Sequence, residues 1–486
     1  MSSERATAGT GADPRYGWVW TVLQADCRSA AVFDEAELAT LLEQAGVPEV
    51  SDAASSLRRG TEAILIGDGA TATPADIDRL ARCLSPGAVL AVAVGGNTAP
   101  AVRGSRIRRA LRLPAVTVGA GLEARRLERR LRAAGLRTRR IATGERTGAH
   151  RIAVGGAAGV PSVGAVVVGG RDETRPTVLA GAVADAAAAI GGTPRIVDAT
   201  VRGSGALLVQ VSIPATAGRY LLRVVAGPAT RLLDASLRNL DQIEAGAPEA
   251  VRMRVVTPIA VGDRGLARWS VEPKIAGREP RQLGSRLRGE CLDFLIGLRS
   301  VPGSGGAAVD GLAADAMALM PHLNEVERRT LALLERSLVK RLGGLPSGWA
   351  HGDFWPGNLL ARGGGLAAVI DWDAADPASL PLIDLLHLLA LGDHRSRRLP
   401  HGRRCSEVLW PLARNGGNRD IGAYCEATGT PADPGTLEAL ALAYWLTRVA
   451  RDLRTFADRA VRRPWMAENV HRPLSVLAAR AHGPGE

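Results

Sequence analysis

The chain has 486 residues, of which 46% are hydrophobic and 3% aromatic. This length suits about three domains or lobes, and the composition excludes a collagen-like chain, a disulfide-rich miniprotein and a wholly disordered chain. The formal charge is +12, and arginine carries nearly all of it, because Lys274 and Lys340 are the only lysines among 61 basic residues. Two explanations fit this bias: the codon usage of a GC-rich genome, or a polyanionic partner.

The cysteines and the N-terminus bear on the cellular compartment. The five cysteines are scattered and form no CxxC pair, which favours reduced thiols in a cytosolic protein. Residues 1–15 are polar and lack the apolar segment of a signal peptide, so we expect a disordered tail. No apolar stretch reaches the ~18 residues of a membrane span. We therefore expect a cytoplasmic protein without a membrane span.

Residues 16–172 alternate apolar runs with amphipathic ones. The predicted strands are Ile64–Gly69, Ala88–Gly95 and Thr138–Ala142, and the predicted helices are Ala75–Leu84 and Gly121–Ala134. Strands that alternate with helices at this spacing favour a parallel α/β layer.

Two segments of this region resemble the later half of class I methyltransferase domains. They are LARCLSPGAVLAVAV at Leu80–Val94 and LERRLRAAGLRTRRI at Leu127–Ile141. Those domains also carry an early glycine-rich loop, and residues 16–60 contain no G-x-G-x-x-G. We therefore expect a degenerate Rossmann-like domain used for packing or docking, with a methyltransferase–kinase fusion as a weaker alternative.

The positive charge is concentrated between residues 101 and 146. This segment holds 14 arginines against Glu123, Glu128 and Glu145, a net charge of +11. Codon usage alone would spread the charge more evenly, so the segment is a candidate surface for an anionic partner. No aromatic residue lies among these arginines to stack on bases, which disfavours single-stranded nucleic acid.

A glycine-rich stretch and Arg171–Pro176 mark a predicted boundary near residue 172. Beyond it we expect a small, mostly antiparallel sheet with one helix over residues 173–275, and a helical lobe over 276–486. The elements expected in the first part are a helix at Thr177–Ile190, strands at Arg195–Val201, Ala206–Ile213 and Tyr220–Val225, a helix at Ala229–Ile243, and strands at Arg252–Ala260 and Leu266–Glu272.

The segment WAHGDFWPGNLLARGGGLAAVIDWDAA, residues 349–375, carries the chemistry. Asp353 precedes a tight turn, Asn358 follows five residues later, and a hairpin turning at Gly363–Gly365 ends at Asp371. The hairpin is expected to bring these three side chains to one end of its two strands. Their oxygens suit Mg²⁺, which keeps few protein ligands, and a carboxylate beside them can accept a hydroxyl proton. An Asx-rich hairpin end without function is the structural alternative.

This segment resembles the aminoglycoside phosphotransferase/choline kinase-like family, whose kinase-like fold has two lobes. The signature H-G-D-x-x-x-x-N followed by I-D-W is met by His351, Gly352, Asp353, Asn358, Asp371 and Trp372, and the resemblance extends over about residues 180–486. It implies an ATP- and Mg²⁺-dependent transfer of phosphate to a small-molecule hydroxyl.

The resemblance also implies roles for single residues. Asp353 would be the catalytic base, and Asn358 and Asp371 would hold Mg²⁺. Structural support would come from three residues: His351 would tie the catalytic loop to the metal-ligand region, Trp372 would pack, and Asp384 would brace the loop from a following helix.

The first lobe departs from the family pattern. Gly203 and Gly205 stand where the family covers the nucleotide phosphates, and the backbone near Val271–Pro273, with Glu272, stands where it binds adenine. The position of the phosphate-binding lysine holds Arg223, and its acidic partner would be Asp234. Because arginine is planar and bulkier than lysine, this exchange is not conservative.

The acceptor is expected to be neutral or anionic. After the I-D-W segment, where the family builds its acceptor pocket, the chain offers Arg395, Arg397, Arg398, Arg403 and Arg404, with His394 and His401, and only Asp393 as a nearby acid. A sugar, glycan or metabolite fits this charge better than a polycationic aminoglycoside. The alternative function is a catalytically weak or inactive nucleotide-binding pseudokinase that docks an anionic partner through its arginine-rich domain.

Overall fold

The computed structural model describes residues 177–481, apart from 202–205, 215–216, 228, 304–307, 393–395 and 456–457, and shorter segments before them. The main earlier segments are 27–33, 36–52, 61–66, 88–95, 115–133, 136–146, 149–153 and 164–170. The chain divides into two compact units. The sheet unit comprises residues 11–231 and 258–274, and the helical unit comprises residues 232–257 and 275–486.

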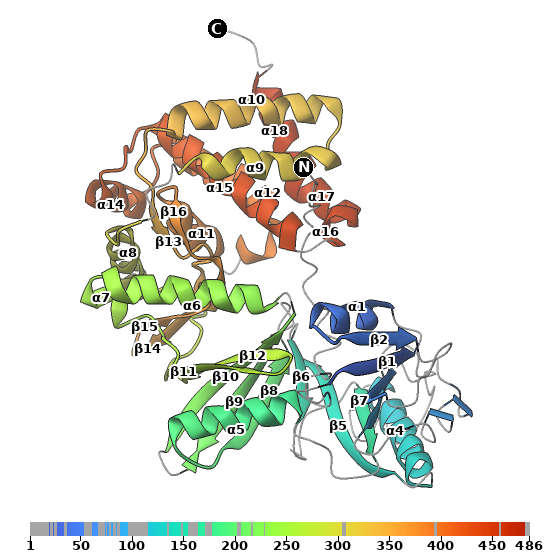
Figure 1. Cartoon of the computed structure of the whole chain (residues 1–486). Coiled ribbons are helices and arrows are strands. Elements are labelled where there is room, and N and C mark those ends of the chain that lie inside the picture. Colours follow the sequence, from blue (N-terminus) through green and yellow to red (C-terminus); the bar gives the residue numbers. More distant parts are fainter. Residues whose placement is uncertain are drawn as a thin grey trace. The chain divides into compact units, whose positions relative to one another are not determined.

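Twelve of the described strands form one sheet in the sheet unit (Figure 1). The order across it is β11-β12-β10-β9-β8-β6-β5-β7-β4-β3-β1-β2. The strands are β1 (Ser29–Phe33), β2 (Glu49–Asp52), β3 (Ala63–Ile66), β4 (Val89–Gly95), β5 (Arg137–Arg146), β6 (Ala149–Ala153), β7 (Gly164–Gly170), β8 (Arg195–Val201), β9 (Leu207–Ile213), β10 (Gly218–Ala226), β11 (Ala260–Arg264) and β12 (Ala267–Pro273).

The strands β2, β1, β3 and β4 are parallel, and the remaining pairs across the sheet are antiparallel. The parallel part is apolar on both faces, as the continuous runs AILI and AVLAV require. One face packs against α4 (Ala115–Ala133), and the other shares a core with α1 (Ala36–Gln44) and α5 (Val178–Ile190).

The core under α1 and α5 continues below β9, β10 and β12. The link in the sheet is the pair β6–β8, where His150 faces Val201 and Arg151 faces Thr200. The boundary predicted near residue 172 therefore lies inside the sheet unit, whereas the sheet unit ends at Lys274, beside the second predicted boundary. The division into domains by sequence stays a prediction.

Most predicted elements of this part occur with shifted ends. The helix α4 begins at Ala115, earlier than the predicted Gly121, and of the helix predicted at 75–84 only residues 75–76 and 79–80 are described as helical. The helix α5 begins after the cap Thr177, whose side chain accepts a hydrogen bond from the N–H of Ala180, and ends at Gly191 with φ 85°.

The predicted strand Arg252–Ala260 is wrong. A short helix, α7 (Glu249–Arg252), occupies its start, and the next strand begins only at Ala260. The β-branched residues Val255, Val256 and Thr257 favoured a strand. Instead Val255 makes an isolated bridge to Val369, and the N–H of Val369 donates to the carbonyl of Arg254, so the segment packs beside the hairpin.

The helical unit is built around one large core. Its first long helix is α6 (Ala229–Gly246), which begins at the edge of the sheet unit. The other helices are α8 (Ser285–Arg299), α9 (Asp310–Leu319), α10 (Glu325–Leu342), α11 (Ile383–Gly392), α12 (His401–Arg404), α13 (Trp410–Arg414), α14 (Arg419–Thr428), α15 (Pro434–Thr455), α16 (Asp458–Val461), α17 (Arg463–Met466) and α18 (Arg472–Ala481).

Helix α15 is the centre of this unit. It packs against α9, α10, α11 and α13, and the tryptophans Trp410 and Trp445 meet edge to face with ring centroids 5.9 Å apart. The neighbouring helix α10 begins with a capping box, in which Asn324 and Glu327 each bind the other's backbone N–H. Two short sheets complete the unit: β13 (Gly348–Ala350) with β16 (Asp376–Ser379), and β14 (Leu359–Arg362) with β15 (Gly365–Val369).

Among the described helices, none combines the length and apolar character needed to cross a bilayer.

Candidate active site

The candidate catalytic loop runs from β13 to β14 and is shaped by Gly352. This residue has φ 72°, and a Cβ there would lie 2.1 Å from the carbonyl oxygen of Ala374. Only glycine therefore fits between His351 and Asp353. The next residue, Phe354, is fully buried and stacks on Phe294 with ring centroids 5.7 Å apart, which fixes the loop to α8.

Asp384 holds the loop from the first turn of α11. Its two carboxylate oxygens accept hydrogen bonds from the backbone N–H groups of His351 (2.5 Å) and Gly352 (2.9 Å). Burial raises the pKa of Asp384, and the neighbouring His351 and the two N–H donors oppose that rise. Asp384 therefore contacts the loop from the helix that follows it, and its role as a brace stays a prediction.

His351 joins the loop to the end of the hairpin. The imidazole is fully buried, and its Nε2 lies 3.0 Å from the carbonyl oxygen of Ile370, the residue before Asp371. The ring packs edge to face on Trp372 with centroids 4.6 Å apart. The indole N–H of Trp372 donates to the carbonyl of Val369. Both residues therefore contact the end of the hairpin, and their supporting roles stay predictions.

Asn358 is in direct contact with Asp353. Its Nδ2 donates to the carboxylate oxygen Oδ2 of Asp353 (2.8 Å) and to the Asp353 carbonyl (2.9 Å). Because both bonds leave from Nδ2, the amide oxygen Oδ1 is the atom that can meet a cation. The backbone carbonyl of Asn358 also accepts a hydrogen bond from Ile370, which joins the loop to the returning strand.

Asp371 follows Ile370 directly and is exposed. Its φ is 69°, a conformation that costs free energy for a residue with a side chain and that clusters at functional sites. The hairpin thus places Asp371 next to the backbone contact of Asn358. One amide oxygen and one exposed carboxylate fit Mg²⁺, which is bound by few protein side chains.

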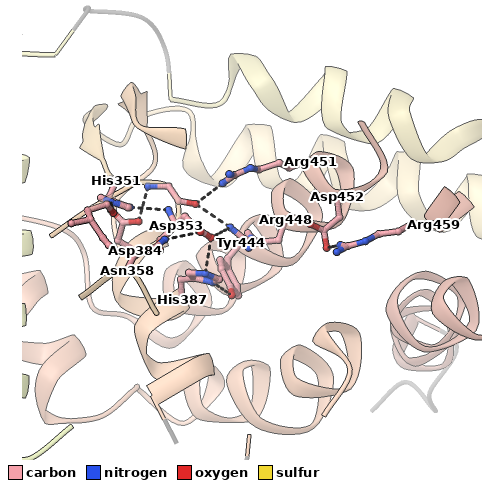
Figure 2. A network of polar contacts seen from close by, with 12 residues as sticks. His351, Asp353, Asn358, Asp384, His387, Tyr444, Arg448, Arg451, Asp452 and Arg459 are labelled. Atoms are coloured by element: carbon pink, nitrogen blue, oxygen red, sulfur yellow. Dashed lines mark hydrogen bonds and ion pairs between the residues drawn. The ribbon is translucent and has the colours of Figure 1, made fainter. Parts of the chain in front are cut away.

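The structure adds a second side to the site that the sequence did not predict. Helix α15 carries Arg448, whose Nη1 donates to the Oδ1 atom of Asp353 (2.8 Å) and to the carbonyl of Gly352 (3.1 Å). Arg451, one turn later, donates from Nη1 to the same carbonyl (2.9 Å). Figure 2 shows both arginines reaching the loop from the side opposite to His351 and Asp384.

Helix α11 supplies a further partner, His387. Its Nε2 lies 3.2 Å from the Oδ1 atom of Asp353, and its Nδ1 lies 2.7 Å from the hydroxyl of Tyr444 on α15 (Figure 2). Tyr444, Arg448 and Arg451 recur at helical spacing along one face of α15. The signal available in the sequence was the recurrence of basic side chains on one face of an otherwise apolar helix.

These contacts set the ionisation of the site. Burial works to raise the pKa of Asp353, but the hydrogen bond from His387 and the charges of Arg448 and Arg451 outweigh it, so the pKa lies well below its usual range. Burial lowers the pKa of His387 to about 3, and Arg448 adds to this effect. At neutral pH, Asp353 is therefore ionised and His387 is neutral.

The low pKa of His387 predicts a loss of stability in mild acid. The unfolded histidine, with a pKa of about 6.5, takes up a proton as the pH falls below that value, whereas the folded one does not until about pH 3. Between pH 7 and pH 5, wild-type protein should lose about 2 kcal/mol more unfolding free energy than His387→Gln. Urea unfolding at both pH values checks this. Burial also lowers the pKa of His401, but this residue is present in both proteins and contributes equally to both losses of unfolding free energy. Equal losses would contradict the assignment.

The residues predicted to bind the nucleotide lie outside the candidate catalytic loop. Arg223 is on β10, opposite Leu208 and Ser270, and Glu272 is on β12, opposite Leu221. Asp234 is on α6, in the helical unit, so its pairing with Arg223 stays a prediction. Gly203 and Gly205 lie outside the described residues.

Most of the described arginines that were predicted near the acceptor pocket form ion pairs or hydrogen bonds with other residues of the chain. Arg403 pairs with Glu407 and Glu468, and Arg397 pairs with Glu279 at 3.6 Å. Arg404 is buried and donates to the carbonyl of Leu399, and Arg398 is exposed. Asp393, His394 and Arg395 lie outside the described residues.

Comparison with known proteins supports the resemblance found in the sequence. Residues 198–408 match the profile of the phosphotransferase enzyme family, which confirms the predicted family resemblance and kinase-like phosphotransferase fold. The comparison with curated proteins gives no match.

Solved structures of small-molecule phosphotransferases are also similar at low identity. One is the ADP-bound aminoglycoside phosphotransferase APH(2'')-Ib, with 15% identity and a TM-score of 0.42, over 62% of this chain and 98% of that one. Another is the macrolide 2'-phosphotransferase MphH from Brachybacterium faecium, with 17% identity and a TM-score of 0.37, over 62% of this chain and 97% of that one.

Proposed function

We propose that this chain, whose residues 198–408 match the phosphotransferase enzyme family, transfers the γ-phosphoryl group of ATP to a hydroxyl of a small molecule. One observation carries the proposal. Asp353 is an ionised carboxylate that Asn358 holds at 2.8 Å, on a loop whose backbone Asp384 fixes through two hydrogen bonds. Phosphoryl transfer requires this kind of fixed carboxylate beside oxygen ligands for a cation.

Asp353 would orient the acceptor hydroxyl and accept its proton. Its low pKa makes it a weak base, but this is compatible with the reaction. The transition state is loose, so positioning and charge neutralisation contribute more than early proton removal. Asn358 and His387 would keep the carboxylate oriented, since each contacts one of its oxygens.

Mg²⁺, when bound, would neutralise charge on the nucleotide phosphates. In this proposal Asn358 and Asp371 hold it, supported by the amide oxygen and the exposed carboxylate at the end of the hairpin. In the sheet unit, Arg223 would contact the phosphates with Gly203 and Gly205, and the backbone around Glu272 would bind adenine. Asp234 would pair with Arg223.

We also propose a cytoplasmic location and a Rossmann-like origin for the N-terminal part of the sheet unit. Cys27, Cys291, Cys405 and Cys425 are buried thiols and not disulfides, which supports a reducing compartment. The parallel order β2-β1-β3-β4 with helices on both faces supports the Rossmann-like assignment.

A nucleotide-binding docking protein is the second candidate. The observation that favours it is the exposed basic face of α4, where Arg125, Arg126 and Arg129 are exposed. An anionic partner would bind there, and Asp353 would then be dispensable.

A nucleotide-binding assay tests the metal-dependent site. ATP with Mg²⁺ should raise the melting temperature of the wild-type protein by several degrees, as expected for a ligand at ~100 times its Kd. Asp371→Ala should lose this shift, because the cation would lose a charged ligand. Asp376→Ala, a nearby exposed aspartate outside the proposed site, is the control. If ATP with Mg²⁺ neither stabilises the wild type nor is consumed, the enzyme proposal fails.

A further inference from the structure

Helix α15 directs two arginines, Arg448 and Arg451, at the loop that carries Asp353. Arg448 pairs with Asp353, and Asp452, the acidic residue next to Arg451, pairs with Arg459 (Figure 2). Asp384, which contacts the loop from α11, accepts hydrogen bonds from backbone N–H groups. Among the described residues, Arg451 is thus left without an ion-pair partner within 4.0 Å.

Arg451 uses little of its binding capacity. Within the described part of the chain, its guanidinium makes one hydrogen bond, to the carbonyl of Gly352, and has no carboxylate within 4.0 Å. A guanidinium has five N–H donors. Burial lowers the pKa of Arg451, and the charge of Arg448 lowers it further. The carboxylates of Asp353, Asp452 and Asp371 oppose this change without reversing it.

A purely structural role does not account for this arrangement. A neutral donor would suffice to bind the carbonyl of Gly352, and Arg448 already donates to it. A partly buried cation with one neutral partner carries a desolvation cost that an anion would offset. The fork of Arg451 matches the two oxygens of a carboxylate or a phosphate.

We propose that Arg451, with Arg448, forms an anion-binding subsite for the acceptor, so that the phosphorylated compound is a compact hydroxyl compound that carries a carboxylate or phosphate group. This inference rests on the proposed function, since it places the acceptor hydroxyl at Asp353. Arg448 and Arg451 are one helical turn apart, about 5–6 Å between their Cβ atoms. The anionic group therefore lies only a few bonds from the reacting hydroxyl.

Binding of four matched sugars tests the subsite. The probes are glucose 6-phosphate, glucuronate, glucose and glucosamine, titrated by calorimetry at constant ionic strength with Mg²⁺ and a non-hydrolysable ATP analogue. The wild type should bind at least one anionic sugar about tenfold or more tightly than glucose, and glucosamine most weakly. The two anionic probes distinguish a phosphate from a carboxylate.

Variants locate the effect. Arg451→Gln should lose the preference for the anion, Arg451→Lys should keep part of it because the charge remains, and Arg329→Gln should keep all of it. Arg329 is a matched control, since it is exposed on α10 and pairs with Glu325 away from the site. Unchanged binding of the ATP analogue shows that each variant is folded.

Three results would overturn the inference: no binding of either anionic sugar, glucose or glucosamine binding as tightly as they do, or an undiminished preference in Arg451→Gln. If the ATP analogue binds the wild type while one of these results is obtained, only this inference fails. If the analogue does not bind the wild type at all, the proposed function fails with it.

Discussion

Replacing Asp353 with asparagine is expected to lower the rate of ATP-dependent phosphoryl transfer by about 10²- to 10⁴-fold, the range that a positioned acid or base contributes. The substitution keeps the size and the contact with Asn358 but removes the charge and the proton acceptor. Arg448 also loses its ionic partner. Formation of ADP in a coupled assay measures the rate.

Affinity for the nucleotide separates this effect from unfolding. Asp353→Asn should bind a non-hydrolysable ATP analogue within a few-fold of the wild type, because Asn358 and Asp371 remain. Asp263→Asn, at a largely exposed position paired with Arg268, is the control and should retain the wild-type rate. A variant at position 353 that turns over ATP as fast as the wild type would support the docking protein instead.

Asp384→Ala is expected to cause the largest loss of stability among single changes at the site. The substitution leaves the buried N–H groups of His351 and Gly352 without their acceptors. Each buried unsatisfied group costs about 1–3 kcal/mol, so the total is roughly 2–6 kcal/mol. The unfolding free energy of a folded domain is typically about 5–15 kcal/mol, so this loss is a large fraction of it. Urea unfolding monitored by tryptophan fluorescence measures it.

A conservative variant tests the cause. Asp384→Asn keeps one oxygen acceptor and removes a charge that burial disfavours, so its loss should be well below that of Asp384→Ala. If alanine and asparagine destabilise the protein equally, or if alanine costs under about 0.5 kcal/mol, a typical value for a neutral surface change, the brace contributes less than its geometry indicates.

The candidate catalytic loop could be located in the sequence because its signal is local. Asp353, Asn358 and Asp371 lie within 19 residues, and the glycine turn between the strands of the hairpin fixes their register. The contacts of His351 and Asp384 join the same loop to the hairpin and to α11. Steric constraints on the backbone, such as the positive φ at Gly352, involve only neighbouring residues. They can therefore be recognised in the sequence.

The residues that the sequence missed come from distant elements. Arg448 meets Asp353 across 95 residues of chain, and periodicity along α15 shows which residues share a face but not what that face contacts. The same limit applies to the sheet. The pairing of β6 with β8 joins segments on both sides of the predicted boundary, and no local feature of either strand specifies its partner.

Two parts of the helical unit determine the position of the Asp353 carboxylate and its charge environment. The loop, held by Asp384 and His351, fixes where the carboxylate stands, and α15 sets its charge environment. Both arginines also donate hydrogen bonds to the carbonyl of Gly352. A movement of α15 would therefore displace the candidate catalytic loop as well. An acceptor that binds Arg451 would thus be positioned by the same helix that contacts Asp353, the proposed base.

Transfer of a labelled phosphoryl group tests the central claim most directly. The protein is incubated with γ-labelled ATP, Mg²⁺ and a fractionated extract of small metabolites, and the products are separated by mass spectrometry. The proposed function predicts that the label appears in a small hydroxyl compound with the wild type and not with Asp353→Asn. Label that stays in ATP, or that enters the same product equally with both proteins, would contradict it.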